Sequence, residues 1–147
     1  MGRCIHVIVY AMSSLTTMSI QIGKHSARVD GDTLYLSLYG DFLLEDLKPI
    51  LQLAEGIIVE YGYYFALADI SQLAAVPAET RHFGAQWARV HPMRGNVCYG
   101  GSLAVRTVLT LVLRAISVVS SSLAPLAFFK TEQESLAWIV AQRRKPA

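Results

Sequence analysis

Hydrophobic and polar residues alternate with a period of two near the start of the chain. Leu34, Leu36 and Leu38 are each followed by tyrosine or serine, which is typical of a strand with two unlike faces. The pair Asp30-Gly31 separates this run from another β-favouring run, and an Asp-Gly pair between such runs favours a tight turn. We therefore expect a hairpin whose strands cover 23–29 and 33–39.

The period then changes to that of a helix. From Leu43 to Tyr61 hydrophobic residues recur at helical spacing with charged residues opposite, and Gly62 is a natural stop. Pro49 lacks an N–H, so it must lie in the first turns or cause a kink. A second helix is expected from Pro77 to about residue 91, with Phe83, Trp87 and Val90 on one face.

Two more helices are expected in the second half of the chain. The first runs from Ser102 to Ser121 and is aliphatic except for one polar stripe, formed by Ser102, Arg106, Thr110, Arg114, Ser117 and Ser121. Its arginines argue against a membrane span, since each costs roughly 2.5–3.5 kcal/mol at a bilayer centre. Two interpretations of its wide apolar face stay open: packing on a sheet, or contact with a partner as well. The last helix starts at Thr131-Glu132-Gln133-Glu134, a capping box, and is expected to turn Leu136, Ile139 and Val140 inward.

Apolar strands are expected between these helices, at 63–68, 95–100 and 125–129, the first ending on a turn at Asp69-Ile70-Ser71. The order ββαβαβαβα predicts an α/β fold, a mixed five-stranded sheet packed by about four helices. Residues 18–144 form one expected domain. Residues 1–17 do not match the pattern of the rest of the chain. We interpret them as a flexible extension, or as the result of a translation start assigned too far upstream, rather than as a targeting signal.

Composition adds a charge asymmetry. The chain has 147 residues, 53% hydrophobic and 16% charged, which suits one globular domain. Residues 30–79 hold nine acidic residues against Lys48 alone, whereas 80–130 hold no acidic residue and six basic ones. In one interpretation the two halves form an acidic and a basic face that dock on partners or on a second copy. In the other, folding interleaves the halves and their electrostatic fields cancel. Cys4 and Cys98 suit reduced thiols of a cytoplasmic protein, with Cys98 buried and structural.

Three segments together resemble the SpoIIAA-like branch of the STAS superfamily, named for bacterial anti-sigma-factor antagonists. They are Leu38-Tyr39-Gly40-Asp41, Leu67-Ala68-Asp69-Ile70-Ser71, and the closing segment from Phe128 to Ile139. The resemblance spans roughly 18–143 and implies that fold and a regulatory, protein-binding role.

The sigma-regulating members of that family carry a phosphorylatable serine at the start of the second helix. On their pattern Ala78 falls at this position, and alanine has no hydroxyl to phosphorylate. Thr80 is displaced by two residues and is preceded by Glu79, whose charge would repel an added phosphate. The resemblance therefore implies a module without the phosphoserine switch.

Candidate site residues lie where two strands end. Asp69 and Ser71 come after one strand, and Gly100-Gly101-Ser102 come after the next, with Arg106 one helical turn further. Backbone N–H groups at a helix start attract anions, so an anion site is one interpretation. The other is a tight turn in which only glycine fits.

An enzyme is not expected, because the chain lacks a nucleophile elbow, and His82 and His91 are expected to face solvent. We predict no catalytic residue, metal or cofactor, no nucleic-acid partner and no transmembrane segment. The first functional hypothesis is a non-enzymatic interaction or regulatory module with a protein partner, or a homodimer through the Ser102–Ser121 helix. The alternative is a carrier or sensor of a small apolar or anionic ligand, lipid-like or phosphate-bearing. Its cavity would be lined by aromatic residues, namely Tyr61, Tyr63, Tyr64, Phe65 and Phe83.

Overall fold

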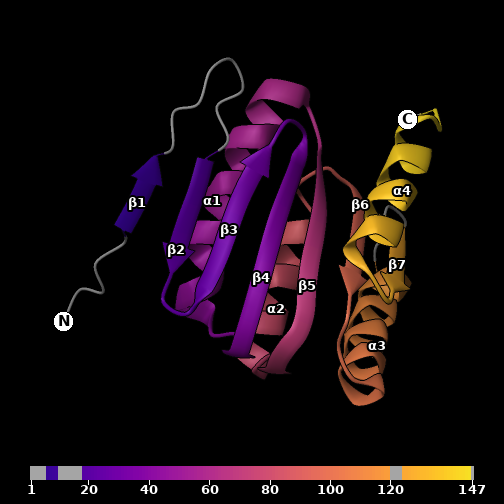
Figure 1. Cartoon of the computed structure of the whole chain (residues 1–147). Helices are drawn as coiled ribbons and strands as arrows, with labels where there is room; N and C mark the ends of the chain where they lie inside the picture. The colour runs from indigo at the N-terminus through magenta and orange to yellow at the C-terminus, as the bar shows by residue number, and fades with distance from the viewer. Residues whose placement is uncertain (1–5, 10–17, 120–123, 147) are drawn as a thin grey trace.

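A mixed sheet of seven strands organises the chain (Figure 1). The computed structural model describes residues 6–9, 18–119 and 124–146. The elements are β1 (His6–Val9), β2 (Met18–Ile22), β3 (His25–Asp30), β4 (Thr33–Asp41), α1 (Leu44–Tyr61), β5 (Tyr64–Ala75), α2 (Ala78–Ala88), β6 (Met93–Tyr99), α3 (Leu103–Val119), β7 (Leu126–Phe129) and α4 (Glu132–Arg143). Strands β1 to β4 pair antiparallel, and β4 to β7 pair parallel. The predicted α/β class and four helices are confirmed.

The predicted number of five strands is too low, because β1 and β2 precede the expected hairpin. Residues 23 and 24, expected inside a strand, instead form a turn with Gly23 in the left-handed region, so that Ile22 pairs with His25. The strand β1 lies within the expected extension 1–17 and pairs with β2. The rest of that extension lies outside the described residues.

The central strand β5 is twice as long as predicted. It does not end on a turn at Asp69-Ile70-Ser71 but continues to Ala75. The reason is that β4 also continues to Asp41, which is the register partner of Ala75, so the backbone groups of this segment still find partners. Two register shifts in the β4–β5 pairing, each with its extra residue on β5, mark bulges along this extension.

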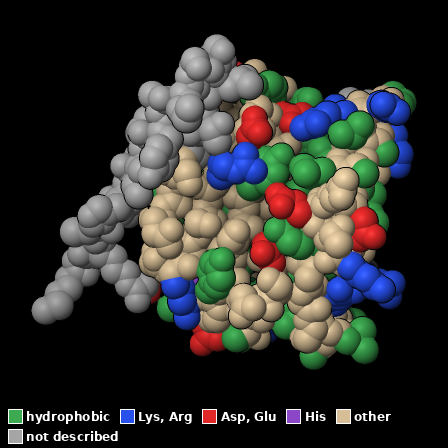
Figure 2. Space-filling model, viewed as in Figure 1, with side chains coloured by type: hydrophobic (Ala, Val, Ile, Leu, Met, Phe, Trp, Pro, Cys, Tyr) green, Lys and Arg blue, Asp and Glu red, His purple; other side chains and the backbone are tan. Residues whose placement is uncertain are grey.

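Two hydrophobic cores cover the two faces of the sheet. On one face α1, α2 and α3 pack over a large core that includes Leu34, Ile50 and Ile70. On the other, α4 covers a smaller core built on Phe65 and Val97. None of the described helices covers this second face over β2 to β4 (Figure 1). Figure 2 shows only a few hydrophobic and charged side chains there, among other side chains and backbone.

Helix ends agree with the predicted chemistry more closely than helix faces do. Gly62 adopts a left-handed φ of 80°, and Thr131 forms the expected capping box with Glu134. Val140, however, is exposed rather than inward. Val90, expected on one helix face with Phe83 and Trp87, lies beyond the end of α2 at Ala88 and is also exposed.

A buried polar contact between β3 and α1 had no counterpart among the predictions. His25 is fully buried, and its Nδ1 accepts a 3.0 Å hydrogen bond from the backbone N–H of Tyr39. Its Nε2 lies 3.3 Å from Oδ2 of Asp46, within ion-pair distance but outside hydrogen-bond geometry. The same Asp46 oxygen accepts from the backbone N–H of Leu43 at the start of α1. These contacts hold the beginning of α1 against the hairpin.

A second long-range contact ties the end of α4 to the turn before β4. Arg143 donates to buried Asp32 from Nε at 3.0 Å and from Nη2 at 2.5 Å, and Thr33 and Tyr63 donate to the same carboxylate. Burial raises the pKa of Asp32, but the hydrogen bonds from Arg143, Thr33 and Tyr63 outweigh it, so the pKa lies below its ordinary value of 3.8. The carboxylate is therefore held ionised. It binds the end of α4 to a residue 111 positions earlier in the sequence.

We predict that Arg143→Gln lowers the free energy of unfolding by about 2 kcal/mol at pH 7, because it leaves the Asp32 carboxylate buried without its cation. This figure is below the range for fully buried pairs because the Arg143 side chain is 41% exposed. Urea denaturation measures it, with the exposed neighbour Arg144→Gln as the matched control. Equal stability of the two variants would contradict the prediction.

The same pair predicts a pH dependence. Since the pKa of Asp32 is lower in the folded than in the unfolded chain, the unfolded chain binds more protons near pH 3–4. The stabilisation is complete above about pH 5 and disappears as the pH falls through the folded-state pKa. In Asp32→Asn the acid-side slope of stability against pH should be shallower, as denaturation at pH 3, 5 and 7 would measure. An unchanged slope would contradict this assignment.

Candidate functional site

The two halves of the predicted site meet at the end of the parallel strands. Gly100 and Gly101 come directly after β6 with φ values of 72° and 77°, which favour glycine. A Cβ on Gly100 would lie 2.8 Å from Cβ of Ser71, and one on Gly101 would lie 2.8 Å from Cδ1 of Ile70. The turn after β6 therefore packs directly against β5, and glycine is needed there for space as well as for backbone conformation.

Asp69 brings negative charge to this place. Its Oδ1 accepts hydrogen bonds from the backbone N–H of Ser71 at 3.0 Å and from the Ser71 hydroxyl at 2.6 Å. Asp69 therefore satisfies a backbone N–H from within a strand rather than from a turn. Tyr99 is the register partner of Asp69 on β6, and burial together with the carboxylate raises the pKa of Tyr99 to about 12.

Ser102 and Arg106 are engaged in the turn itself. The Ser102 hydroxyl accepts from the backbone N–H of Val105 at 3.2 Å, as expected of a helix cap. Arg106 donates from Nε to the carbonyl oxygen of Gly100 at 3.1 Å. With Asp69 nearby and Arg106 bound to the backbone, the geometry favours the tight-turn interpretation, and anion binding stays a prediction.

Helix α3 has apolar residues on two sides, since Val105 and Leu109 pack against the large core while others are exposed. Arg106 and Thr110 of the predicted polar stripe are half-buried, whereas Leu103 and Leu111 are 82% and 60% exposed and Val108 is also exposed. Thr110 donates to the carbonyl oxygen of Arg106, so its hydroxyl is satisfied within the helix. The polar stripe is therefore partly covered at these two residues, whereas Arg114 of the same stripe is exposed. The spacing of the polar residues predicted a polar and an apolar face on this helix, but it did not predict which face would pack on the sheet.

The start of α2 presents no accessible hydroxyl. Ala78, expected at the phosphoserine position, is exposed at the first helical position. Thr80 is 1% exposed, and its Oγ1 has no hydrogen-bond partner among the described residues. A kinase could reach Thr80 only if this turn of the helix opened.

The candidate catalytic groups are not assembled. His82 is exposed and contacts Gln86, as expected, but His91 is half-buried and stacks on Trp87 with ring centroids 3.8 Å apart. Burial raises the pKa of the Cys98 thiol to about 12, so it is a structural residue. Within the described ranges no group of His, Cys, Asp and Glu could hold a metal ion, and no described helix has the length and hydrophobicity to cross a bilayer.

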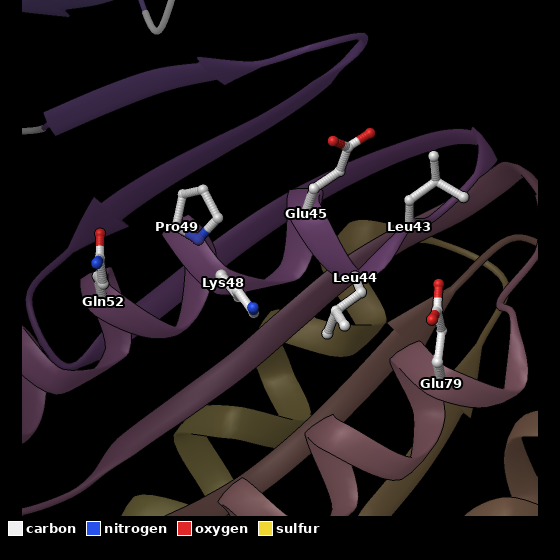
Figure 3. Close-up of a pocket in the computed structure, with 7 residues that line it drawn as sticks. All are labelled: Leu43, Leu44, Glu45, Lys48, Pro49, Gln52 and Glu79. Atoms are coloured by element: carbon white, nitrogen blue, oxygen red, sulfur yellow. The ribbon is translucent and has the colours of Figure 1, made fainter. Parts of the chain in front are cut away.

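Two depressions flank α2. The first is an open groove of about 600 Å³ between the starts of α1 and α2, with the carboxylates of Glu45 and Glu79 and the amine of Lys48 along it (Figure 3). The second is an apolar cleft of about 230 Å³ between the end of β5, α2 and α3. The aromatic residues expected around one cavity do not share one, because Tyr64 and Phe83 belong to the core under α1 and Phe65 to the core under α4.

Comparison with known proteins gives structural matches only. No protein-family model and no curated protein sequence matches the chain. An uncharacterized protein of the DUF3478 family with a SpoIIAA-like fold, from Shewanella loihica PV-4, matches with a TM-score of 0.53 and 15% identity over 87% of this chain and 98% of its own. The unphosphorylated anti-sigma factor antagonist SpoIIAA matches with a TM-score of 0.52 and 13% identity over 76% and 93%. The chain therefore has a SpoIIAA-like fold, as its motifs predicted.

We predict that Gly101→Ala lowers the free energy of unfolding by at least about 1–2 kcal/mol, because alanine is strained at this φ and its Cβ would meet Ile70. Gly56→Ala is the matched control. It lies in α1 with no atom within 4 Å of an added Cβ, and should stabilise the protein by roughly 0.5–1 kcal/mol. Chemical denaturation of both variants measures the difference. A neutral Gly101→Ala would show that the turn is not tight.

Proposed function

We propose that this chain is a non-enzymatic protein-interaction module that binds a protein partner through the outer face of α3. The fold is that of SpoIIAA, a protein named for antagonising an anti-sigma factor, which supports a regulatory or interaction role. The observation that carries the proposal is the exposure of Leu103, Val108 and Leu111 on one helix. Aliphatic side chains gathered on one exposed helix face are typical of a docking surface.

The charges around α3 indicate what the partner looks like. Residues 80–130 contain no acidic residue, and Arg114 is exposed on α3 itself. A second α3 would bring more positive charge to this surface, whereas a segment with apolar residues flanked by aspartate or glutamate would complement it. We therefore propose an acidic amphipathic segment of a different protein as the occupant, in preference to a homodimer through α3.

The absence of a phosphoserine equivalent limits how binding could be controlled. Ala78 has no hydroxyl, and Thr80 is buried. The proposed module therefore binds without a phosphate switch at the start of α2.

Site-directed photo-crosslinking in cells of the source organism tests this proposal. We predict that p-benzoylphenylalanine at Leu111 gives one dominant adduct, and that mass spectrometry maps it to an acidic, apolar-centred segment of another protein. Val59 of α1 is the matched control, since it is an exposed aliphatic helix residue on a different surface. Adducts should fall in number when Leu103→Glu is added, because a charge then enters the apolar contact.

Three results would overturn the proposal. Adducts at Leu111 no more frequent than at Val59 would mean that the face is not an interface. Adducts confined to another copy of this chain would mean self-association. Adducts to segments without acidic residues would remove the charge argument.

A further inference from the structure

The cleft between α2, α3 and the end of β5 has apolar walls and one cation. Eight of its nine lining residues are alanine, valine or leucine, among them Leu73 near the end of β5 and Val105 and Val108 of α3. The ninth is Arg81 of α2. Its volume of about 230 Å³ lies just below the roughly 300–1,000 Å³ of drug-sized sites, so its occupant is small.

Arg81 has no counter-charge in the described structure. Its Nε is buried without a hydrogen-bond acceptor, and no carboxylate forms an ion pair with its guanidinium among the described residues. The neighbouring Glu79 lines the separate groove beside α1 (Figure 3). An unpaired buried donor on a cation is unfavourable, and an anion in the cleft would offset the charge of the guanidinium that lines it.

The position of Arg81 strengthens the preference for an anion. It is the fourth residue of α2, so the positive end of the helix dipole acts in the same direction as its own charge. A guanidinium binds a carboxylate through two parallel hydrogen bonds. The apolar walls, in turn, stabilise a ligand only if it carries a hydrocarbon chain.

We propose that this cleft binds a medium-chain fatty acid, with the carboxylate on Arg81 and the alkyl chain between α2 and α3. The cleft and the proposed docking face share Val108, whereas Leu103 and Leu111 belong to the docking face alone. Ligand binding by the isolated protein needs no partner, so it can succeed or fail whatever the outcome for the proposed protein interaction. The cleft also differs from the predicted aromatic cavity, since no aromatic residue lines it.

Calorimetric titration of the full-length protein with octanoate tests the ligand class. Octanoate should bind at least tenfold more tightly than octanol, which has no charge, and than acetate or inorganic phosphate, which have no alkyl chain. Equal binding of phosphate or acetate would mean an anion site without apolar recognition. Equal binding of octanol would mean an apolar cleft without charge recognition. Either result, or no octanoate binding at millimolar concentration, would overturn the proposal.

Variants test the placement of the ligand. Arg81→Gln should weaken octanoate binding about tenfold or more, and Arg89→Gln, an exposed arginine at the end of the same helix, should leave it unchanged. Val108→Phe narrows the cleft without touching the charge and should weaken octanoate and leave phosphate unaffected. It tests the site even if Arg81→Gln fails to fold. Equal loss in Arg81→Gln and Arg89→Gln, or unchanged octanoate binding in Val108→Phe, would refute the assignment.

Discussion

The pairing of β5 on both edges is the constraint on which the rest of the structure depends. It runs parallel between β4 and β6, and Phe65, Leu67 and Ile70 on its two faces are almost completely buried. A strand covered in this way must satisfy every backbone group through its neighbours, so its register also sets theirs. Both cores form on it, and the turn after β6 packs against it at Ile70 and Ser71.

Two buried polar contacts then hold helices on opposite faces of this sheet. His25 and Asp46 hold the start of α1 against the first hairpin, and Asp32 and Arg143 hold the end of α4 against the turn before β4. A displaced helix would leave a buried charged or polar group without its partner, at a large cost in free energy. These contacts therefore help to select one arrangement among several that would bury similar hydrophobic area.

Helices α2 and α3 carry the features that the core does not explain. Arg106 binds the carbonyl oxygen of Gly100, and Val105 and Leu109 pack on the core, while Leu103 and Leu111 are exposed. Beside them lies a cleft whose single cation, Arg81, has no ion-pair partner in the described part of the chain. Helix α3 packs only lightly on α2 and β5, whereas β5 pairs closely with both of its neighbours, so α3 has a surface left for a partner or a ligand.

Local patterns were enough to determine the four helices and the positions of β3 to β7, although not β1, β2 or the second half of β5. The Asp30-Gly31 turn, the helical spacing from Leu43 to Tyr61, and the capping box at Thr131 each act within a few residues, so they could be recognised without the fold, as could the SpoIIAA-like order of elements. The approach of Gly100 to Ser71, the ion pair from Arg143 to Asp32 and the outward face of α3 join or orient residues distant in sequence. Only tertiary structure decided these features, because periodicity shows that a helix has two faces but not which one the sheet covers.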